Sequence, residues 1–318
     1  MRCGNECAKA RKYESAKART NGVVSIRSCV RAFMRSRLLC VNITLLFLYL
    51  FLPLAAQNEP NRSYSINEGT MIGIGDYRIK NTYLSPYEYT GTGLHIVNER
   101  MKVVSFANYR ISSQQIVDVD FSSVRNPAGT VAALTGFLDY SFGYHYRFQP
   151  ATDFKVLTGA AIKGMFGFVY NTQTANNPIA THVDVDLNAS TMGIYTFRIK
   201  KFPLTVRFQT DIPLTGILFT PNYGQSYYEI FGLGNMSGIV GFSSLHNKFA
   251  MRNFMSVDIS FWKLTLRTGY LNSIYTTRIN AIQTRYVTHN LMIGLVREFV
   301  SFSGKNLRKE NGYQSAYY

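Results

Sequence analysis

Long stretches of this sequence alternate between polar and apolar residues, the period of β-strands whose two faces meet different surroundings. Residues 182–200 show it best, because most even positions are polar, as at Asp184 and Asp186, and most odd positions are apolar, as at Val183 and Val185. That stretch extends roughly 60 Å at about 3.3 Å per residue, whereas strands of soluble sandwiches usually hold about 5–6 residues. The alternation therefore predicts unusually long strands.

The same alternation recurs along the chain, in residues 117–122, 137–148, 154–168, 204–212 and 249–261. Tyr and Phe concentrate on the apolar face towards strand ends, which is typical of the aromatic girdles of membrane barrels. A closed barrel also satisfies every backbone group in lipid. We therefore expect an all-β fold, a transmembrane antiparallel up-and-down β-barrel. A secreted all-β domain is the alternative that the alternation leaves open.

Turn-forming segments divide residues 88–299 into about twelve strands. An even number of strands places both ends of the chain on the periplasmic side of the membrane. Ten or fourteen strands remain possible, because the boundaries near 88–111 and 225–245 are weak. The expected strands are 88–97, 101–111, 114–124, 131–148, 154–170, 181–199, 204–218, 225–234, 236–245, 249–260, 263–276 and 284–299.

An apolar run at residues 38–52 follows the basic residues Arg35 and Arg37 and ends in small residues. These are the parts of a secretory signal peptide, which we assign to residues 34–56 with cleavage after Ala56. A transmembrane anchor is the alternative, but it needs about 20 apolar residues. Signal peptides begin at the start codon, so residues 1–33 read as a leader upstream of a true start at Met34.

The chain carries 34 Lys and Arg against 18 Asp and Glu, a formal net charge of +16. Taken alone, this indicates nucleic acid or an anionic membrane surface as partner. Removing residues 1–56 takes away ten basic and two acidic residues, so 24 basic and 16 acidic residues and a net charge of +8 remain. All four cysteines leave as well. We therefore expect no nucleic-acid partner, no disulfide and no thiol chemistry.

Charged residues on the polar faces of the predicted strands point into the lumen, with acids and bases in equal number. Because an unpaired charge in a narrow barrel is costly, we interpret them as an internal ion-pair network; a mixed-charge pore is the alternative. The predicted lumen-lining charges are Asp118, Asp120, Asp139, Arg147, Lys155, Lys163, Asp184, Asp186, Arg198, Arg207, Asp211, Arg252, Asp258 and Arg267.

The candidate catalytic residues are His182, Asp184 and Asp186 on one strand face and Asp118 and Asp120 on another, because a spacing of two keeps side chains on one face. Such Asp and His sets resemble those of outer-membrane aspartyl-type proteases, and they also suit a bound cation. No P-loop, nucleophile elbow or H-E-x-x-H string occurs, and no histidine precedes a serine by two positions. We therefore expect no enzyme activity, cofactor or metal, and interpret the Asp and His residues as paired lumen groups.

Two segments flank the predicted barrel. Residues 57–87 contain a short glycine-rich apolar piece and read as a periplasmic segment or a plug inside the lumen. Residues 300–318, with Lys305, Arg308 and Lys309, read as a mobile periplasmic tail.

The segment Tyr83-Leu84-Ser85-Pro86-x-x-Tyr89-x-Gly91, the Ala-Ala-Gln end of the signal peptide and the barrel length together suggest a family. In these features the chain resembles a bacteroidete-type family of predicted outer-membrane barrel proteins of unknown function. The resemblance implies a Gram-negative outer-membrane location. It implies no activity and no functional residues.

The sequence thus predicts an outer-membrane barrel that acts as a narrow channel or passive transporter, or as a structural membrane component. Its expected partners are outer-membrane lipid, the barrel-assembly machinery and a small polar solute. The alternatives are a protease-like or hydrolase-like barrel enzyme that uses the Asp and His residues, and a surface barrel that binds a ligand.

Overall fold

The computed structural model describes residues 63–104, 110–173, 177–199, 202–261, 264–300 and 313–314. The chain divides into two units, Met1–Pro60 and Asn61–Tyr318, and the described residues belong to the second. The predicted leader at residues 1–33 and signal peptide at residues 34–56 lie outside the described residues and stay predictions.

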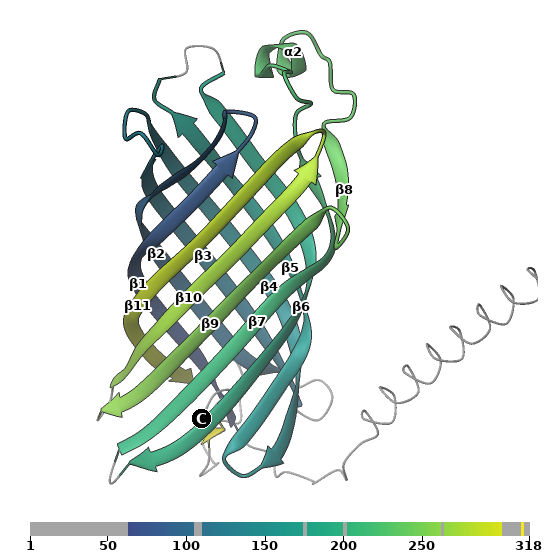
Figure 1. Ribbon diagram of the computed structural model, residues 1–318. Helices are drawn as coiled ribbons and strands as arrows, with labels where there is room; N and C mark the ends of the chain where they lie inside the picture. Colours follow the sequence, from purple (N-terminus) through teal and green to yellow (C-terminus); the bar gives the residue numbers. More distant parts are fainter. Residues whose placement is uncertain are drawn as a thin grey trace, which may run out of the picture. The chain divides into compact units, whose positions relative to one another are not determined.

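Ten long strands form a closed antiparallel barrel within the described part of the chain (Figure 1). The barrel strands are β1 (Ser63–Asn81), β2 (Ser85–Val104), β3 (Ile111–Arg125), β4 (Ala132–Ala151), β5 (Phe154–Asn171), β6 (Ile179–Ile199), β7 (Phe202–Phe219), β9 (Lys248–Phe261), β10 (Leu264–Ile279) and β11 (Ile282–Val300). Consecutive strands pair along the wall, and β1 pairs with β11 in continuous register from Ser65 opposite Val300 to Asn81 opposite Thr284. This last pairing closes the barrel.

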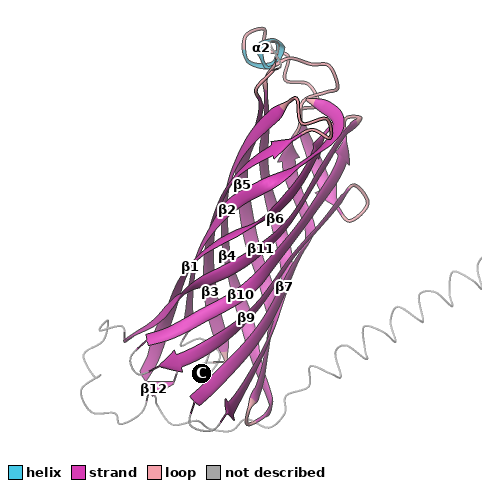
Figure 2. Ribbon diagram, turned by 60° about the vertical axis from the view of Figure 1, so that its left-hand side comes forward, coloured by secondary structure: helices cyan, strands magenta, loops and turns pink. Residues whose placement is uncertain are grey.

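Both β1 and β11 meet the chain's flanking segments at one end of the barrel, which we call the terminal end; the opposite end is the far end. Figure 2 shows strands making the wall, with the short helix α2 (Tyr227–Phe231) beyond the far end. The described residues include no helix long and apolar enough to cross a membrane.

The barrel closes with ten strands rather than the expected twelve. Two predicted strands, 88–97 and 101–111, are largely one strand, β2, since residues 98–100 continue the alternation instead of turning. The predicted strand 225–234 is wrong, because residues 227–231 form α2, whose N-cap Ser226 accepts a hydrogen bond from the backbone of Glu229. The boundary between the expected strands 225–234 and 236–245 therefore lies in the far-end loop 220–239.

The described part of segment 57–87 is neither a plug nor a periplasmic linker, because Ser63–Asn81 is the first barrel strand. The alternation of polar and apolar residues in this strand is interrupted by glycines, which have no side chain to show which face they occupy. At Gly75 a larger residue does not fit, because its Cβ would overlap the carbonyl oxygen of His289 on β11. At the other end of the chain, β12 (Tyr313–Gln314) pairs in parallel with Ser63 and Tyr64.

Strand β7 changes partner halfway along its length. It pairs with β9 from Leu204 to Asp211, and from Thr215 to Phe219 it pairs instead with β8 (Val240–Ser244). Pro213 lies between the two pairings and has no N–H to donate to a ladder. After the turn at 245–247 the chain re-enters the wall at Lys248, the first residue of β9.

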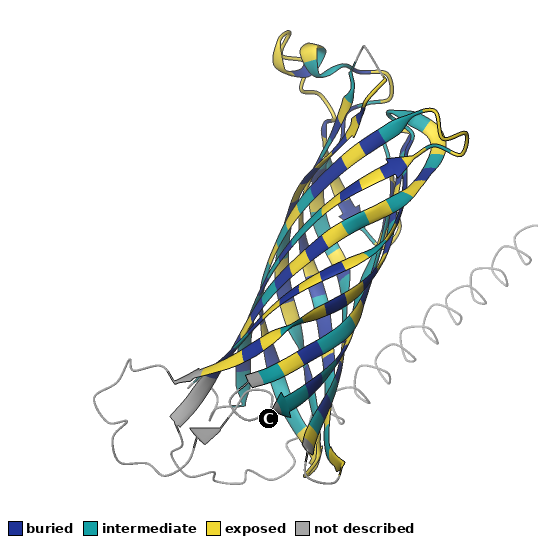
Figure 3. Ribbon diagram, turned by 90° about the vertical axis from the view of Figure 1, so that its left-hand side faces the viewer, coloured by how far each residue is buried: buried dark blue, intermediate teal, exposed yellow. Residues whose placement is uncertain are grey.

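Buried and exposed residues alternate along the strands, as the colours of Figure 3 show. Many exposed residues of the strands are large and apolar, and many buried ones are polar. On β1 and β11, the register partners Ile74 and Leu291 are each 70% exposed, whereas Asn67 and Asn290 are fully buried. The predicted direction of the two faces is confirmed: apolar side chains form the outer surface, and most polar side chains of the strands face the lumen, which they share with clusters of apolar side chains.

The lumen is filled at both ends by side chains. An apolar cluster of Tyr77, Ile79, Tyr89, Val124, Ala133, Val169, Ala180 and Tyr286 lies towards the far end. A second cluster, Met101, Val103, Leu157, Met192 and Ile194, lies towards the terminal end. Most charged residues of the lumen lie between these two clusters.

Candidate functional site

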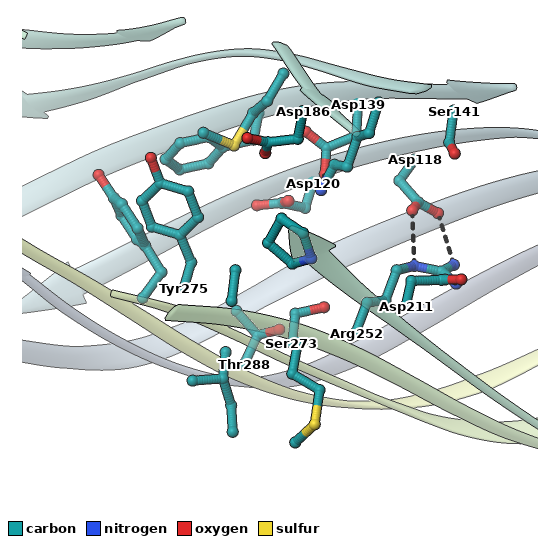
Figure 4. Close-up of a pocket in the computed structure, with 18 of the residues that line it drawn as sticks. Asp118, Asp120, Asp139, Ser141, Asp186, Asp211, Arg252, Ser273, Tyr275 and Thr288 are labelled. Atoms are coloured by element: carbon teal, nitrogen blue, oxygen red, sulfur yellow. Dashed lines mark hydrogen bonds and ion pairs between the residues drawn. The ribbon is translucent and has the colours of Figure 1, made fainter. Parts of the chain in front are cut away.

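A cavity of about 100 Å³ lies inside the barrel, and each of the ten barrel strands contributes to its lining. Figure 4 shows aspartates of β3, β4, β6 and β7 surrounding it. Of the described residues, six aspartates line this space, so we call it the acidic cavity. They are Asp118, Asp120, Asp139, Asp184, Asp186 and Asp211.

Arg252 of β9 contacts Asp118 of β3, a strand that is not its neighbour in the wall, and Asp211, its register partner on the adjacent strand β7. Its Nε donates to Oδ2 of Asp118 at 3.0 Å and its Nη2 to Oδ1 at 3.3 Å, a bidentate pair drawn in Figure 4. Its Nη1 lies 3.6 Å from Oδ2 of Asp211. The guanidinium also lies 5.8 Å above the ring of Phe254. One arginine thus holds two strands of the wall at fixed positions.

Lys248 holds the two aspartates of β6. Its Nζ lies 2.7 Å from Oδ2 of Asp184 and 2.5 Å from Oδ2 of Asp186, with all three side chains at most 5% exposed. The hydroxyl of Tyr275 donates to the same oxygen of Asp184 at 3.0 Å. A third pair joins Lys163 to Asp139 at 2.6 Å.

His182 belongs to the apolar cluster at the far end rather than to an acid–base pair. Its Nε2 lies 2.8 Å from the hydroxyl of Tyr286 and 3.0 Å from Nδ2 of Asn81, and its ring lies 6.0 Å from that of Phe137. The residues His182, Asp184 and Asp186 share one strand face as predicted, but the two aspartates contact Lys248 and His182 does not.

These contacts weigh against the protease-like alternative. Three of its five candidate residues, Asp118, Asp184 and Asp186, hydrogen-bond to arginine or lysine, so they serve as structural counter-charges. Asp120 has no hydrogen bond or ion pair within the described residues and faces His95 on β2. In the described part of the chain, no group of three or more Asp, Glu or His is arranged to hold a metal ion.

Between the cavity and the terminal end, four buried charged residues contact one another inside the lumen; we call Glu99, Arg207, Asp258 and Arg267 the ion-pair layer. Glu99 lies 2.7 Å from Arg207 and 2.9 Å from Arg267, and Arg267 also contacts Asp258 at 2.6 Å. Each side chain is at most 3% exposed. Buried charges in such a chain of bidentate contacts hold one another in place.

Polar side chains connect the layer to the cavity. Gln114 donates to Glu99 at 2.5 Å and to Gln209 at 2.9 Å. Gln209 donates to Asp211 at 3.1 Å, and Ser190 joins Asp211 to His145. A continuous hydrogen-bonded path therefore runs along the lumen from the ion-pair layer to Asp211, whose Oδ2 lies 3.6 Å from Nη1 of Arg252.

Of the fourteen predicted lumen charges, eleven lie in the cavity or the layer. Arg147 and Lys155 are half-buried nearer the terminal end, and Arg198 is exposed near the end of β6. Sequence reasoning missed two central residues. Glu99 fell in the predicted turn between 97 and 101, and Lys248 lay one residue before a predicted strand; an uninterrupted β2 alternation was the signal for the first.

The far-end loop 220–239 lies against three turns or strand ends of the barrel. The hydroxyl of Tyr83 donates to the carbonyl of Gln225 at 2.8 Å, and the backbone of Thr181 donates to the hydroxyl of Tyr227 at 2.6 Å. Asn280 donates to the carbonyl of Gly238 at 2.8 Å. Burial, with nearby Tyr227 and Glu229, raises the pKa of Tyr83 to about 12. Tyr83 is therefore neutral and can donate this hydrogen bond at neutral pH.

A closed antiparallel wall, an apolar outer surface and a charged, closed lumen define a β-barrel of the outer-membrane type. Residues 43–306 match a family described as "Protein of unknown function (DUF3316)". The chain belongs to this family. The predicted resemblance to a barrel family of unknown function is confirmed to that extent, while its bacteroidete-type origin stays a prediction.

No curated protein matches the chain. Among solved structures, the outer membrane protease OmpT from Escherichia coli is similar over 77% of this chain and 99% of its own, with 7% identity and a TM-score of 0.44. The transport unit of the autotransporter AIDA-I from Escherichia coli is similar over 78% and 93%, with 9% identity and a TM-score of 0.38. An outer membrane channel from Pseudomonas putida F1 is similar over 78% and 100%, with 12% identity and a TM-score of 0.33. At these values their activities carry no argument for this chain.

Proposed function

We propose that the protein is an outer-membrane barrel that passes a small polar solute through its lumen, which the ion-pair layer closes in the described state. Outer-membrane lipid would contact the apolar outer surface, and the barrel-assembly machinery would insert the chain. Ile74 and Leu291 support this placement, because side chains that face lipid must be apolar and both are 70% exposed.

The observation that carries the proposal is the polar path along the lumen. A barrel that only needed a filled interior would be served by apolar side chains, since a buried ion pair is often no more stable than a hydrophobic pair of similar volume. This barrel instead buries Glu99, Arg207, Asp258 and Arg267 across its lumen and connects them by Gln114 and Gln209 to a hollow cavity. Charged groups that line a path and can exchange partners are suited to polar solutes.

Planar-bilayer conductance of the purified full chain tests the proposal. We expect the wild type to be mostly closed with rare small openings. A variant with Glu99, Arg207, Asp258 and Arg267 all replaced by alanine removes two acids and two bases together, so no buried charge is left unpaired. We expect its mean current to rise at least tenfold, because the layer no longer fills the lumen.

A matched control removes an ion pair that does not cross the lumen. Glu88 and Arg285 lie 4.0 Å apart and are exposed near the far end, so replacing both with alanine should leave the mean current equal to that of the wild type.

Because Met101 and Met192 are buried in the lumen on the terminal side of the layer, a second lumen variant also replaces both of these residues with alanine. If both lumen variants fold as barrels and neither conducts, the passage is excluded.

A second candidate function is a closed surface barrel that binds a ligand. The observation that favours it is that side chains fill the lumen on both sides of the acidic cavity. Saturable ligand binding by a barrel whose lumen variants do not conduct would support this alternative.

A further inference from the structure

The acidic cavity holds more carboxyl groups than its neighbouring cations can balance. Within the described residues, six aspartates line it, whereas the cations in contact with them are Lys163, Lys248 and Arg252. The ion-pair layer differs, because its two carboxylates meet two guanidiniums. The cavity therefore has a surplus of three carboxyl groups, and three of the six aspartates, Asp118, Asp184 and Asp186, are at most 6% exposed.

The free polar atoms of the lining show where this surplus lies. Lys163 and Lys248 each contact one carboxylate oxygen of the aspartates they hold, and Oδ1 of Asp139, Asp184 and Asp186 is left buried without a hydrogen-bond partner in the described part of the protein. Buried polar atoms are nearly always satisfied in folded proteins, so such a group indicates a missing water, ion or ligand.

His95 gives a second and independent indication of an occupant. It lines the cavity, is 5% exposed, and neither of its ring nitrogens has a hydrogen-bond partner among the described residues. Its Nε2 lies 3.7 Å from Oδ1 of Asp118, too far for a hydrogen bond. It also faces Asp120 across the β2–β3 pairing, and Asp120 has no ion pair of its own. The imidazole of His95 and the carboxylate of Asp120 thus have no hydrogen-bond partner among the described residues on one side of the cavity.

The lining also determines what kind of cation fits. A metal ion is not favoured, because the described residues contain no group of three or more Asp, Glu or His in ligating positions. Ile116, Phe137 and Met165 give the same cavity an apolar side. A water occupies about 10–15 Å³ by this measure, so about 100 Å³ holds either several waters or one small organic molecule.

We propose that the acidic cavity binds a small primary alkylammonium ion. Its N–H groups donate to the free oxygens of the aspartates, and its alkyl chain packs on the apolar side at Phe137. The positive charge offsets part of the carboxylate surplus, which neither water nor a neutral alcohol does. This inference rests on the proposed function, because it names the class of solute that would pass through the lumen. Binding of the cation and its passage are measured by separate experiments.

Isothermal titration of the purified full chain in a nonionic detergent tests the proposal, with butylammonium as probe and butanol and butyrate as comparisons. We expect saturable binding of butylammonium, at least tenfold weaker binding of butanol and none of butyrate. This ordering is a property of the wild type and needs no variant. Equal binding of butanol, or no saturable binding, would show that the surplus carboxyls are protonated or hydrated and would overturn the proposal.

Asp120→Asn locates the site. It keeps the shape of a side chain that has no ion pair and removes one negative charge, so we expect at least tenfold weaker binding of butylammonium. The matched control is Asp153→Asn, the same change at an exposed residue of the β4–β5 turn, which should bind as the wild type does. If the two variants bind alike, the cation site is not in this cavity.

The binding experiment and the conductance experiment test different claims, so either claim can be excluded without the other. Binding without conductance in any lumen variant retains the cation site and excludes the passage. Conductance without binding of butylammonium retains the passage and excludes the cation site.

Discussion

The acidic cavity and the ion-pair layer are built on the same ten strands by the same alternation, yet their charges balance differently. In the layer, Glu99 and Asp258 meet Arg207 and Arg267, and each side chain is at most 3% exposed. In the cavity, six aspartates meet three cations within the described residues, and several oxygens have no partner. In this barrel, inward-facing charges that neutralise one another are packed in direct contact. The region with more carboxyl groups than cations is the one that contains the cavity.

Arg267→Met should have the largest effect on stability, because Arg267 is the contact that Glu99 and Asp258 share. Removing one partner of a buried pair leaves uncompensated charge, which costs about 3–5 kcal/mol. Urea unfolding of the refolded barrel, followed by tryptophan fluorescence or circular dichroism, measures the loss. Adding Asp258→Leu should recover part of it. A loss below about 1 kcal/mol would mean that the layer does not depend on its pairing.

Lys248→Met makes a comparable change beside the cavity and should cost less. It leaves Asp184 and Asp186 without their cation, but the adjoining space admits water or a bound cation, and the hydroxyl of Tyr275 still donates to Asp184. We expect a loss of about 1–3 kcal/mol in the same unfolding assay. A loss as large as that of Arg267→Met would remove the distinction between the two regions.

Asp120→Asn should have the smallest effect, a change within about 0.5 kcal/mol of the wild type or a slight gain in stability. The carboxylate has no ion pair within the described residues, and its removal relieves repulsion from the neighbouring aspartates. Asp258→Asn, the same change in the layer, should instead destabilise the barrel, because it weakens a bidentate contact with Arg267. Similar unfolding midpoints for these two variants would contradict the comparison.

Sequence reasoning predicted much of the wall. The expected strands 154–170 and 181–199 differ from β5 and β6 by at most two residues at either end, since their alternation is long and clear. It failed where local signals misled it. Glycines in β1 interrupted its alternation, and residues 225–234 were expected to form a strand although Ser226 caps a helix there. Glu99 was lost because a predicted turn interrupted β2.

The alternation by itself determined that the chain forms long strands with polar residues on one side, because side chains of a strand point to opposite faces in turn. Which charges meet was decided by the closed barrel alone. Arg207 and Arg267 contact Glu99 over separations of 108 and 168 residues, and no local pattern encodes such pairs. Strand number, tilt and register determine the height along the barrel axis at which each inward side chain lies. These quantities are fixed by the closure of the barrel through the β1–β11 pairing.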